Sequence, residues 1–419
     1  MDIFLKNKNF RKFTIAGWLS NAGNILFYLA LMTYASRLQN YTLALSLITI
    51  TEALPDLIQS ISGYLADRTK NKYRVIVWLA LLRFALYLLV GVLFVTNIAG
   101  WDLVLMVIGI NFISDLSGMY SGGLQTPLIV DLVGKDEMAE AQGFSSGISQ
   151  VITMVAQFVG SGLLLFMSYS GLAIINALTF LVAGLLFANI TANVKKQQPQ
   201  DQIAAVNEQN FFATITSSLK QVKRARGLLT IVLVIAMLNG LLSSVEPLIS
   251  IVLAGNKGML IGSFSFTLAL INALIASGMA LGSTLGTKFL KKASLFQIAL
   301  LATLISSGMA GAILCKSTIA ILILGVALGF AIGTASPKLT QWLVTSVDRQ
   351  ILSSSVGLLN TILVIAGPLM TTIFTGIAGA VGINYALSGI LVLSLIVFAV
   401  TLKVMLNNTS KQTEAAEED

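Results

Sequence analysis

Twelve long runs of apolar residues dominate this sequence and leave few folds open to it. Each run has about 20 residues or more, the length that a helix needs to cross the ~30 Å hydrocarbon core of a bilayer. Spanning strands would instead be short and alternate in polarity. The runs are continuous, so they predict helices, over residues 13–36, 42–66, 74–97, 102–130, 139–166, 170–192, 228–254, 260–287, 295–315, 318–345, 352–378 and 382–406.

Composition points the same way, because 56% of the residues are hydrophobic and only 11% are charged. A soluble protein carries about 25% charged residues. The net charge of +8 lies in short loops between the apolar runs, which is a topology signal rather than a nucleic-acid-binding surface. We therefore expect an all-α membrane protein whose partners are lipid and a small molecule, with no nucleic acid.

The lysines and arginines also predict the orientation of the chain. If the N-terminus is cytoplasmic, 21 of the 26 fall in cytoplasmic segments, whereas Arg37, Lys257 and Lys316 lie outside and Arg83 and Lys338 lie within spans. Positive charge concentrates on the cytoplasmic side of membrane proteins. Both termini are therefore expected in the cytoplasm.

A single long polar connection divides the predicted helices six and six. We expect a six-helix bundle over residues 1–192, a basic cytoplasmic linker over 193–227, a second bundle over 228–406 and an acidic cytoplasmic tail over 407–419. The halves resemble each other at an offset near 215, where residues 121–128 match 336–343 and residues 63–67 match 282–286. Two pseudo-symmetric bundles predict a site near the bilayer midplane between them, reached by rocking one against the other.

Carboxylates inside the spans are the candidates for ion coupling: Glu52, Asp56, Asp115 and Glu246. A charge at the centre of a membrane helix costs at least ~2.5–3.5 kcal/mol, so such groups face a cavity, pair or bind protons. The chain has no histidine, which leaves proton coupling to these acids. Arg83 is the expected counter-charge to Asp56 or Asp115, and Lys338 is a second buried cation; a purely structural ion pair is the alternative.

Polar side chains within the spans are candidates for lining the substrate cavity. Asn21, Asn24 and Tyr28 share one face of the first helix. The others are Asn239, Gln341, Trp342 and Asn360. Each asparagine is open to a second interpretation as an interhelical hydrogen bond.

Several kinds of chemistry are not expected. One cysteine, Cys315, and no histidine argue against a disulfide framework, a metal site or a usual nucleophile–base pair. Residues 282–288 are rich in glycine but lack the spacing of a phosphate-binding loop. We expect no enzyme activity and no cofactor, with an ion gradient, of protons in the first place, as the driving force.

One stretch resembles a known family signature. Gly63-Tyr-Leu-Ala-Asp67-Arg68, with a basic turn that reaches Arg74, is similar to the G-x-L-A-D-R-x-G-R-K signature of the major facilitator superfamily. Leu54-Pro55 and residues 329–357 look similar to the macrolide-efflux branch of the bacterial drug:proton antiporters. The chain departs from the family where Lys70 and Asn71 replace glycine and arginine, and where Asp115 stands in place of a helix 4 arginine.

This resemblance implies the major facilitator fold, alternating access and a cytoplasmic gate made of Gly63, Asp67, Arg68, Arg74 and Asp131. In that gate Asp67 would meet the start of helix 11 near residues 353–355, and Asp131 would pair with Arg68 or Arg74.

The same resemblance implies a monomer in the bacterial plasma membrane that exports amphiphilic drug-like compounds, of macrolide or multidrug type, in exchange for protons, and so confers antibiotic resistance. Two alternatives stay open. One is a proton- or sodium-coupled transporter of a defined solute such as a siderophore or lipid-like metabolite, with Arg83 and Lys338 binding an anionic group. The other is a membrane receptor or scaffold that transports nothing.

Overall fold

A computed structural model describes residues 2–57, 59–96, 98, 100–134, 137–194, 228–286, 289–291, 293–346 and 352–417. Within these ranges the chain is helical, and no strand occurs. The elements are α1 (Asp2–Lys6), α2 (Lys8–Ala35), α3 (Tyr41–Leu57), α4 (Gln59–Arg68), α5 (Lys72–Leu93), α6 (Gly100–Val133), α7 (Met138–Leu163), α8 (Tyr169–Val194), α10 (Leu228–Gly255), η1 (Lys257–Met259), α11 (Phe264–Leu281), η2 (Gly282–Gly286), α13 (Leu295–Leu314), α14 (Thr318–Ser346), α15 (Leu352–Ala380) and α16 (Ile383–Glu417).

Every predicted span has its counterpart among these helices. The second span corresponds to α3 and α4, and residue 58 between them lies outside the described ranges. The eighth span is α11 followed by the π-helical turn η2. Nine of the described helices are long and apolar enough by themselves to cross a bilayer. Helix α7 is not one of them, because it alternates apolar residues with glutamines and serines such as Gln142, Ser146 and Gln150.

Contacts divide the chain into two compact units. Unit 1 comprises Met1–Asn40, Ile58–Glu208 and Ser263–Ala269; unit 2 comprises Tyr41–Leu57, Gln209–Gly262 and Leu270–Asp419. Helix α3 thus packs with the second half of the sequence. The division into halves at residues 192 and 228 stays a prediction, since residues 195–227 lie outside the described ranges.

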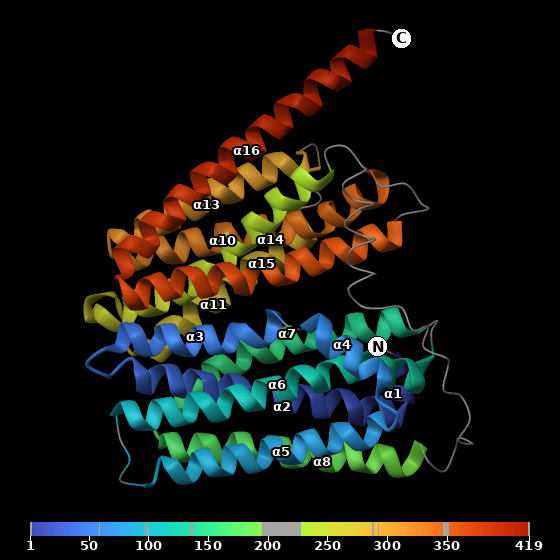
Figure 1. Ribbon diagram of the computed structural model, residues 1–419, viewed down its shortest axis with the longest axis vertical. Helices are drawn as coiled ribbons and strands as arrows, with labels where there is room; N and C mark the ends of the chain where they lie inside the picture. Colours follow the sequence, from blue (N-terminus) through green and yellow to red (C-terminus); the bar gives the residue numbers. More distant parts are fainter. Residues whose placement is uncertain are drawn as a thin grey trace. The chain divides into compact units, whose positions relative to one another are not determined.

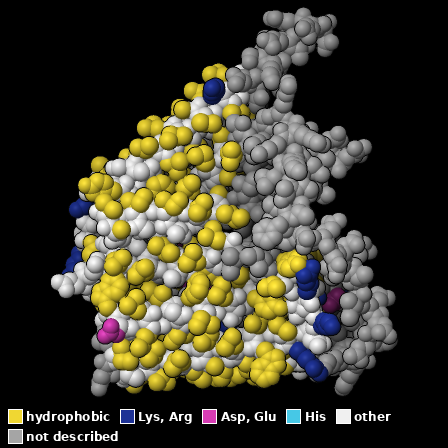
Figure 2. Space-filling view, viewed as in Figure 1, with side chains coloured by type: hydrophobic (Ala, Val, Ile, Leu, Met, Phe, Trp, Pro, Cys, Tyr) yellow, Lys and Arg dark blue, Asp and Glu magenta, His cyan; other side chains and the backbone are white. Residues whose placement is uncertain are grey.

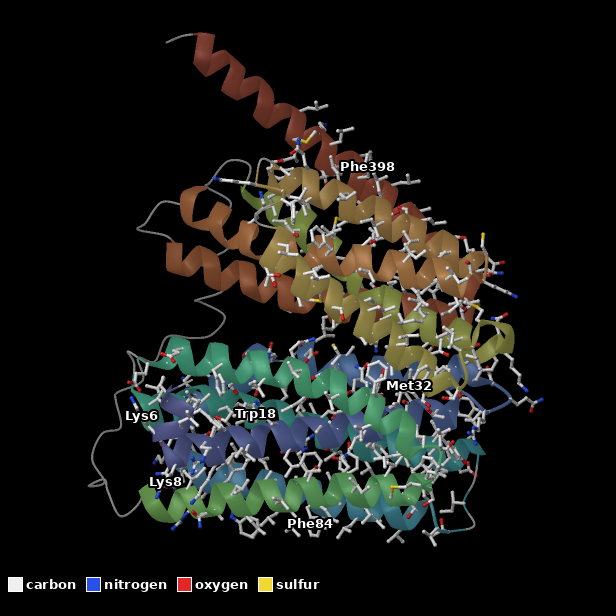
Figure 3. The ribbon with its side chains drawn as sticks, turned by 180° about the vertical axis from the view of Figure 1, so that it is seen from behind. Lys6, Lys8, Trp18, Met32, Phe84 and Phe398 are labelled. Atoms are coloured by element: carbon white, nitrogen blue, oxygen red, sulfur yellow. The ribbon has the colours of Figure 1, made fainter. Side chains whose placement is uncertain are left out.

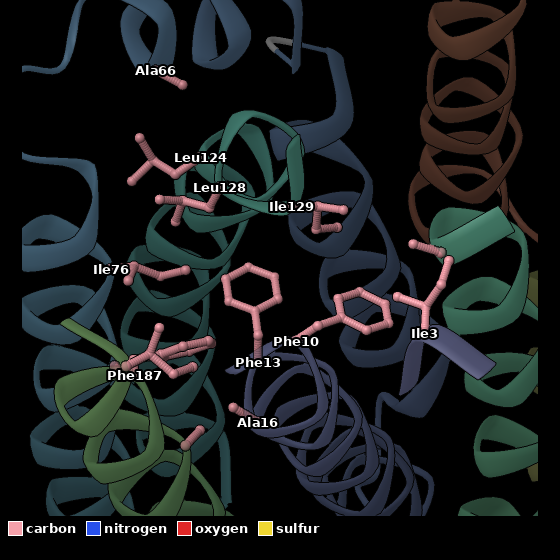
Figure 4. Packing of buried hydrophobic residues seen from close by; sticks show 14 residues of the cluster. Ile3, Phe10, Phe13, Ala16, Ala66, Ile76, Leu124, Leu128, Ile129 and Phe187 are labelled. Atoms are coloured by element: carbon pink, nitrogen blue, oxygen red, sulfur yellow. The ribbon is translucent and has the colours of Figure 1, made fainter. Parts of the chain in front are cut away.

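Unit 1 is a bundle in which α5 and α2 both pack along α8, and α6 packs against α5 (Figure 1). Its core includes Phe10 and Phe13 of α2, Leu128 of α6 and Phe187 of α8 (Figure 4). The Phe13 and Phe187 rings meet edge to face, 5.4 Å apart. These large side chains at helical spacing fix which face of each helix points inward.

The N-terminus of unit 1 is held by Asn7. Its Oδ1 accepts hydrogen bonds from the backbone N–H groups of Asn9 and Phe10, at 3.0 Å each, which caps α2. Its Nδ2 donates to the carbonyl of Leu132 at 2.8 Å. Figure 3 shows Lys6 and Lys8 at this end of unit 1, with Met32 toward the other end of α2.

The turn that carries the family signature is anchored to α6. Ser62 donates to the Met119 carbonyl at 3.0 Å, and the Thr69 and Tyr120 hydroxyls lie 2.5 Å apart. The close approach of α4 and α6 is at Gly123 of α6, where a Cβ would lie 3.1–3.2 Å from Ser62 and Ala66 of α4. No described atom lies within 4 Å of the equivalent position at Gly63.

In unit 2, α10 and α3 both pack along α15 (Figure 1). Pro247 interrupts α10. A proline has no N–H to offer the carbonyl four residues earlier. That carbonyl belongs to Ser243, and the Thr371 hydroxyl of α15 donates to it at 3.1 Å. A hydrogen bond between helices thus replaces the one that the proline removes.

Two facing rows of glycine bring α11 and α14 together. Gly278, Gly282 and Gly286 repeat every four residues on one side, and Gly325, Gly329 and Gly333 on the other. At four of the six positions a Cβ would meet the opposite backbone at less than 2.5 Å. Small residues at this spacing let membrane helices pack backbone to backbone.

The surface suits lipid. On the face seen in Figure 2, hydrophobic side chains cover much of the described surface, and the charged ones lie toward its margins. Residues 407–417, expected to be a solvated tail, continue α16 as helix to Glu417.

Candidate functional site

Arg83 is the centre of a polar cluster in unit 1. It lies in the middle of α5 and is only 7% exposed. Its Nε donates to the Ser114 hydroxyl of α6 at 3.0 Å, and its Nη2 donates to Asn24 Oδ1 of α2 at 2.9 Å. The guanidinium carbon lies 4.0 Å from the centre of the Phe180 ring of α8. One cation therefore joins four helices through neutral groups and an aromatic face.

A second chain of hydrogen bonds starts one turn further along α5. The Tyr87 hydroxyl donates to Asn111 Oδ1 at 2.5 Å, and Asn111 Nδ2 donates to Asp115 Oδ2 at 2.6 Å. Tyr87 and Asn111 are buried, and the Tyr87 ring packs against Phe27 and Phe180. This packing holds the tyrosine, and through it the amide, in a position that orients the carboxylate.

The two chains meet on one face of α6. Ser114 and Gly118 are one turn apart, and a Cβ on Gly118 would lie 3.1 Å from the Arg83 guanidinium. Asp115 follows Ser114 directly on this face. Because Gly118 has no side chain, the Arg83 guanidinium has space to lie against α6 next to the turn that carries Asp115. The predicted ion pair of Arg83 with Asp56 or Asp115 stays a prediction.

The first helix uses its asparagines for helix packing. Asn24 binds Arg83, and Asn21 Nδ2 donates to the hydroxyls of Ser149 and Thr153 of α7, at 3.2 and 3.1 Å. Tyr28 follows on the same face and is half-buried. These contacts correspond to the interhelical alternative for both asparagines.

In unit 2, Glu246 of α10 lies beside Asn272 of α11. Asn272 Nδ2 donates to Glu246 Oε1 at 2.7 Å. Glu246 is solvent-exposed although it lies near the middle of its span, Leu233–Gly255. Ser243 is also exposed one turn earlier, and Asn239 precedes it by another turn. The three form a polar stripe on one side of α10.

The remaining predicted carboxylates are in α3. Glu52 and Asp56 are exposed and separated by one turn, as their spacing predicts. Within the described residues, no group of three acidic or cysteine side chains is arranged to hold a metal ion.

The predicted gate is described in part. The Arg68 guanidinium lies 4.0 Å from the centre of the Tyr64 ring, Arg74 is exposed, and the described residues show no ion pair between either arginine and Asp131. The expected pairing of Asp131 is not found among the described side chains. The side chains of Asp67 and of residues 353–355 lie outside the description.

Lys338 does not meet a carboxylate in the described part of unit 2. Its ammonium group donates to the carbonyls of Lys291 and Ala293, in the segment before α13. Gln341 and Trp342 belong to α14 and Asn360 to α15, but only their backbone is described.

Sequence reasoning missed Tyr87, Asn111 and Asn272, three neutral residues that hold the charged ones. The sequence did contain a signal for Tyr87 and Asn111. Tyr87 is four residues from Arg83, and Asn111 is four residues from Asp115, so each shares a helix face with a charged residue. Nothing in the spacing links Asn272 to Glu246, which is 26 residues away.

Comparison with known proteins identifies the family of the chain. Residues 117–371 match the family model described as Major Facilitator Superfamily. No curated protein sequence matches the chain.

Solved transporter structures share the fold at low sequence identity. A peptide transporter designated POT has a TM-score of 0.68 and 12% identity, with 95% of each chain covered. A bacterial homologue of the human lysosomal transporter Spinster has a TM-score of 0.64 and 14% sequence identity, and the match covers 95% of this chain and 97% of the other. The nucleoside transporter NupG has a TM-score of 0.67 and 11% sequence identity, and the match covers 95% of this chain and 98% of the other. The family match spans more than half of the residues, and the chain is a transporter that belongs to the major facilitator superfamily.

Proposed function

We propose that this transporter exports amphiphilic drug-like compounds in exchange for protons, and that Asp115 carries the coupling proton. The observation that supports this most directly is the Tyr87–Asn111–Asp115 chain beside Arg83. It places an oriented carboxylate near the middle of the 34-residue helix α6. Membrane-embedded acids next to polar partners mark proton and ion pathways in transporters.

Protonation of Asp115 would act on the packing of unit 1. A neutral Asp115 no longer attracts the guanidinium of Arg83, and that guanidinium links α2, α5, α6 and α8. A proton that binds one arrangement of these helices more tightly than another shifts the balance between them. The proposed exchange of a proton for substrate needs such a difference.

The alternative with an anionic substrate has less support. Arg83 is buried and bound to Ser114 and Asn24, and Lys338 is bound to backbone carbonyls. Both cations therefore already hold neutral acceptors from the protein itself. An exporter of amphiphiles in the bacterial plasma membrane, with both termini in the cytoplasm, also agrees with the resemblance to the drug:proton antiporters. Among the structural relatives are transporters of peptides and of nucleosides.

The test is transport of a fluorescent amphiphile in proteoliposomes with an imposed pH gradient. We expect transport that depends on the gradient and is lost in Asp115→Asn. Asp102→Asn is the matched control, because Asp102 is an exposed carboxylate in the first turn of the same helix. Glu52→Gln and Asp56→Asn test the acids of α3. Transport that survives both collapse of the gradient and Asp115→Asn would refute proton coupling at this residue.

A further inference from the structure

The last turn of the eighth span has a different hydrogen-bond spacing from the helix that leads into it. The turn η2 is π-helical over Gly282–Gly286, whereas α11 before it is α-helical. A π-turn bonds each residue to the fifth one along instead of the fourth, so it accommodates one residue more than an α-helical turn. The α spacing returns directly afterwards, because the Leu290 N–H donates to the Gly286 carbonyl at 2.8 Å. The turn η2 is therefore a one-turn insertion rather than a frayed helix end.

The internal repeat shows that this place in the fold does not require a π-turn. Residues 63–67, which match 282–286, lie in α4 and are α-helical. The hydrogen bond between the neighbouring helices is also reversed. In unit 1 Ser62 donates to the carbonyl of Met119 on α6. In unit 2 Thr334 of α14, which corresponds to Met119 at the offset of 215 (334 − 119), donates to a carbonyl of η2 at 3.2 Å and to one of its own helix at 2.8 Å.

Hydroxyl groups surround the π-turn. Ser283 and Thr284 both donate to the carbonyl of Ala280, at 3.0 and 2.8 Å. The Thr334 hydroxyl fills the space beside Gly286, where a Cβ would overlap it. Serine and threonine side chains satisfy backbone groups where a membrane helix departs from the α spacing. The π form is thus supported by particular side chains, and the α form is the one that the backbone itself favours.

A second group on α14 holds the chain after the turn. Lys338 lies one turn beyond Thr334 and shares its helix face. Its ammonium donates to the carbonyl of Ala293 and lies 3.5 Å from that of Lys291. Conversion of η2 to an α-turn would rotate the following chain by about 100° and move it by about 1.5 Å along the axis. Both carbonyls would then leave Lys338, so this contact belongs to the π form.

We propose that η2 is a hinge with a π-helical and an α-helical state, and that Thr334 and Lys338 are the positioning residues that hold the π state. The two bundles of a secondary transporter move against each other in each cycle. The hinge lets the end of the eighth span turn while the glycine rows keep α11 against α14. This inference concerns the movement of the helix and rests neither on proton exchange nor on the proposed substrate.

The test is the distance between two spin labels in the full-length protein, in lipid nanodiscs without substrate. The labels are attached at Phe289→Cys and Ile323→Cys, whose side chains are 79% and 65% exposed, after Cys315→Ser removes the natural cysteine. A side-chain tip about 5–6 Å from the helix axis moves by about 8–9 Å when the helix turns by about 100°. We therefore expect two distance populations, of which the π state is the larger.

Thr334→Val and Lys338→Met should each raise the minor population by about two- to tenfold, the change in an equilibrium that the loss of one hydrogen bond gives. Thr303→Val is the matched control, because that threonine is buried and donates to carbonyls of its own helix α13. Its two populations should equal those of the unsubstituted protein. The ratio of populations is read from the folded fraction, so it decides even where a variant unfolds early.

Deletion of Ser283 is the sharpest variant. It removes the extra residue of the π-turn, so an α-turn forms while the following chain stays where the π state places it. We expect a single population at the major distance and an unfolding temperature no lower than before. Transport of the fluorescent amphiphile should nevertheless become at least about tenfold slower, because a conformational step has been removed.

A single distance in the unsubstituted protein and in both point variants would overturn the proposal. Two populations that persist after deletion of Ser283 would overturn it as well, since the movement would then arise elsewhere. An undiminished transport rate in the deletion variant would refute the role of the hinge in transport. If the unsubstituted protein does not move the amphiphile, only the proposed substrate fails, because the distances decide on the hinge without any substrate.

Discussion

The facing glycine rows of α11 and α14 give the sharpest prediction about stability. In Gly329→Ala the new Cβ would lie 2.0 Å from the carbonyl oxygen of Ile275 and 2.9 Å from its carbon. A Cβ essentially never lies closer than 3.0 Å to another heavy atom, and ordinary contact begins at 3.4 Å. The helices must therefore separate locally by about 1.0–1.4 Å (3.0 − 2.0 and 3.4 − 2.0). All the obstructing atoms belong to backbone, so no side chain can turn away.

The cost follows from the packing that this separation removes. A gap of 0.5–1 Å forfeits about a quarter to a half of each atom-pair attraction. Gly325 and Gly333 pack against Ile275 and Met279 in the same row, so their contacts weaken together. Overpacking of this kind costs about 1–3 kcal/mol. We expect Gly329→Ala to lower the free energy of unfolding by that amount.

Gly311→Ala is the matched control. Gly311 lies inside α13, and no described atom lies within 4 Å of the position of its Cβ. Alanine there should be neutral or stabilise by up to about 1 kcal/mol, because glycine is the poorer helix former. Thermal unfolding of both variants in the same detergent measures the difference. An unfolding temperature of Gly329→Ala equal to or above that of Gly311→Ala would show that the two rows do not touch as described.

Two further predictions concern single hydrogen bonds. Thr371→Val should lower the free energy of unfolding by about 0.6–1.7 kcal/mol, because it removes the donor to the Ser243 carbonyl that Pro247 leaves open. Thr371→Ser keeps a hydroxyl and should restore most of the lost stability in the same unfolding assay. Asn7→Ala should lower the free energy of unfolding by about 1–2 kcal/mol, because it removes the cap of α2. Asn7→Asp keeps the cap and loses only the hydrogen bond to the Leu132 carbonyl. Equal unfolding temperatures for these two variants would assign the effect to the Leu132 contact instead.

The helices were predictable because each span is a local property of about 20 residues. The contacts between helices were not predictable. Sequence spacing indicates which residues share a helix face, but it does not indicate which other helix packs against that face. Gly123 illustrates this, because its Cβ position lies against Ser62 and Ala66 of α4, a contact that no sequence pattern indicates. Arg83 shows the same for a charged residue. Its position predicted Asp56 or Asp115 as partner, whereas the structure also gives it two neutral acceptors, Ser114 and Asn24.

The two polar clusters differ in how their charges are balanced. Arg83 has neutral acceptors on two helices and an aromatic face on a third. The partner of Glu246 is the side-chain amide of Asn272 on the neighbouring helix. Under the proposed function, a change of charge at Asp115 acts on the helices that Arg83 joins. Substitutions around Arg83 should therefore alter the coupling of transport to the proton gradient.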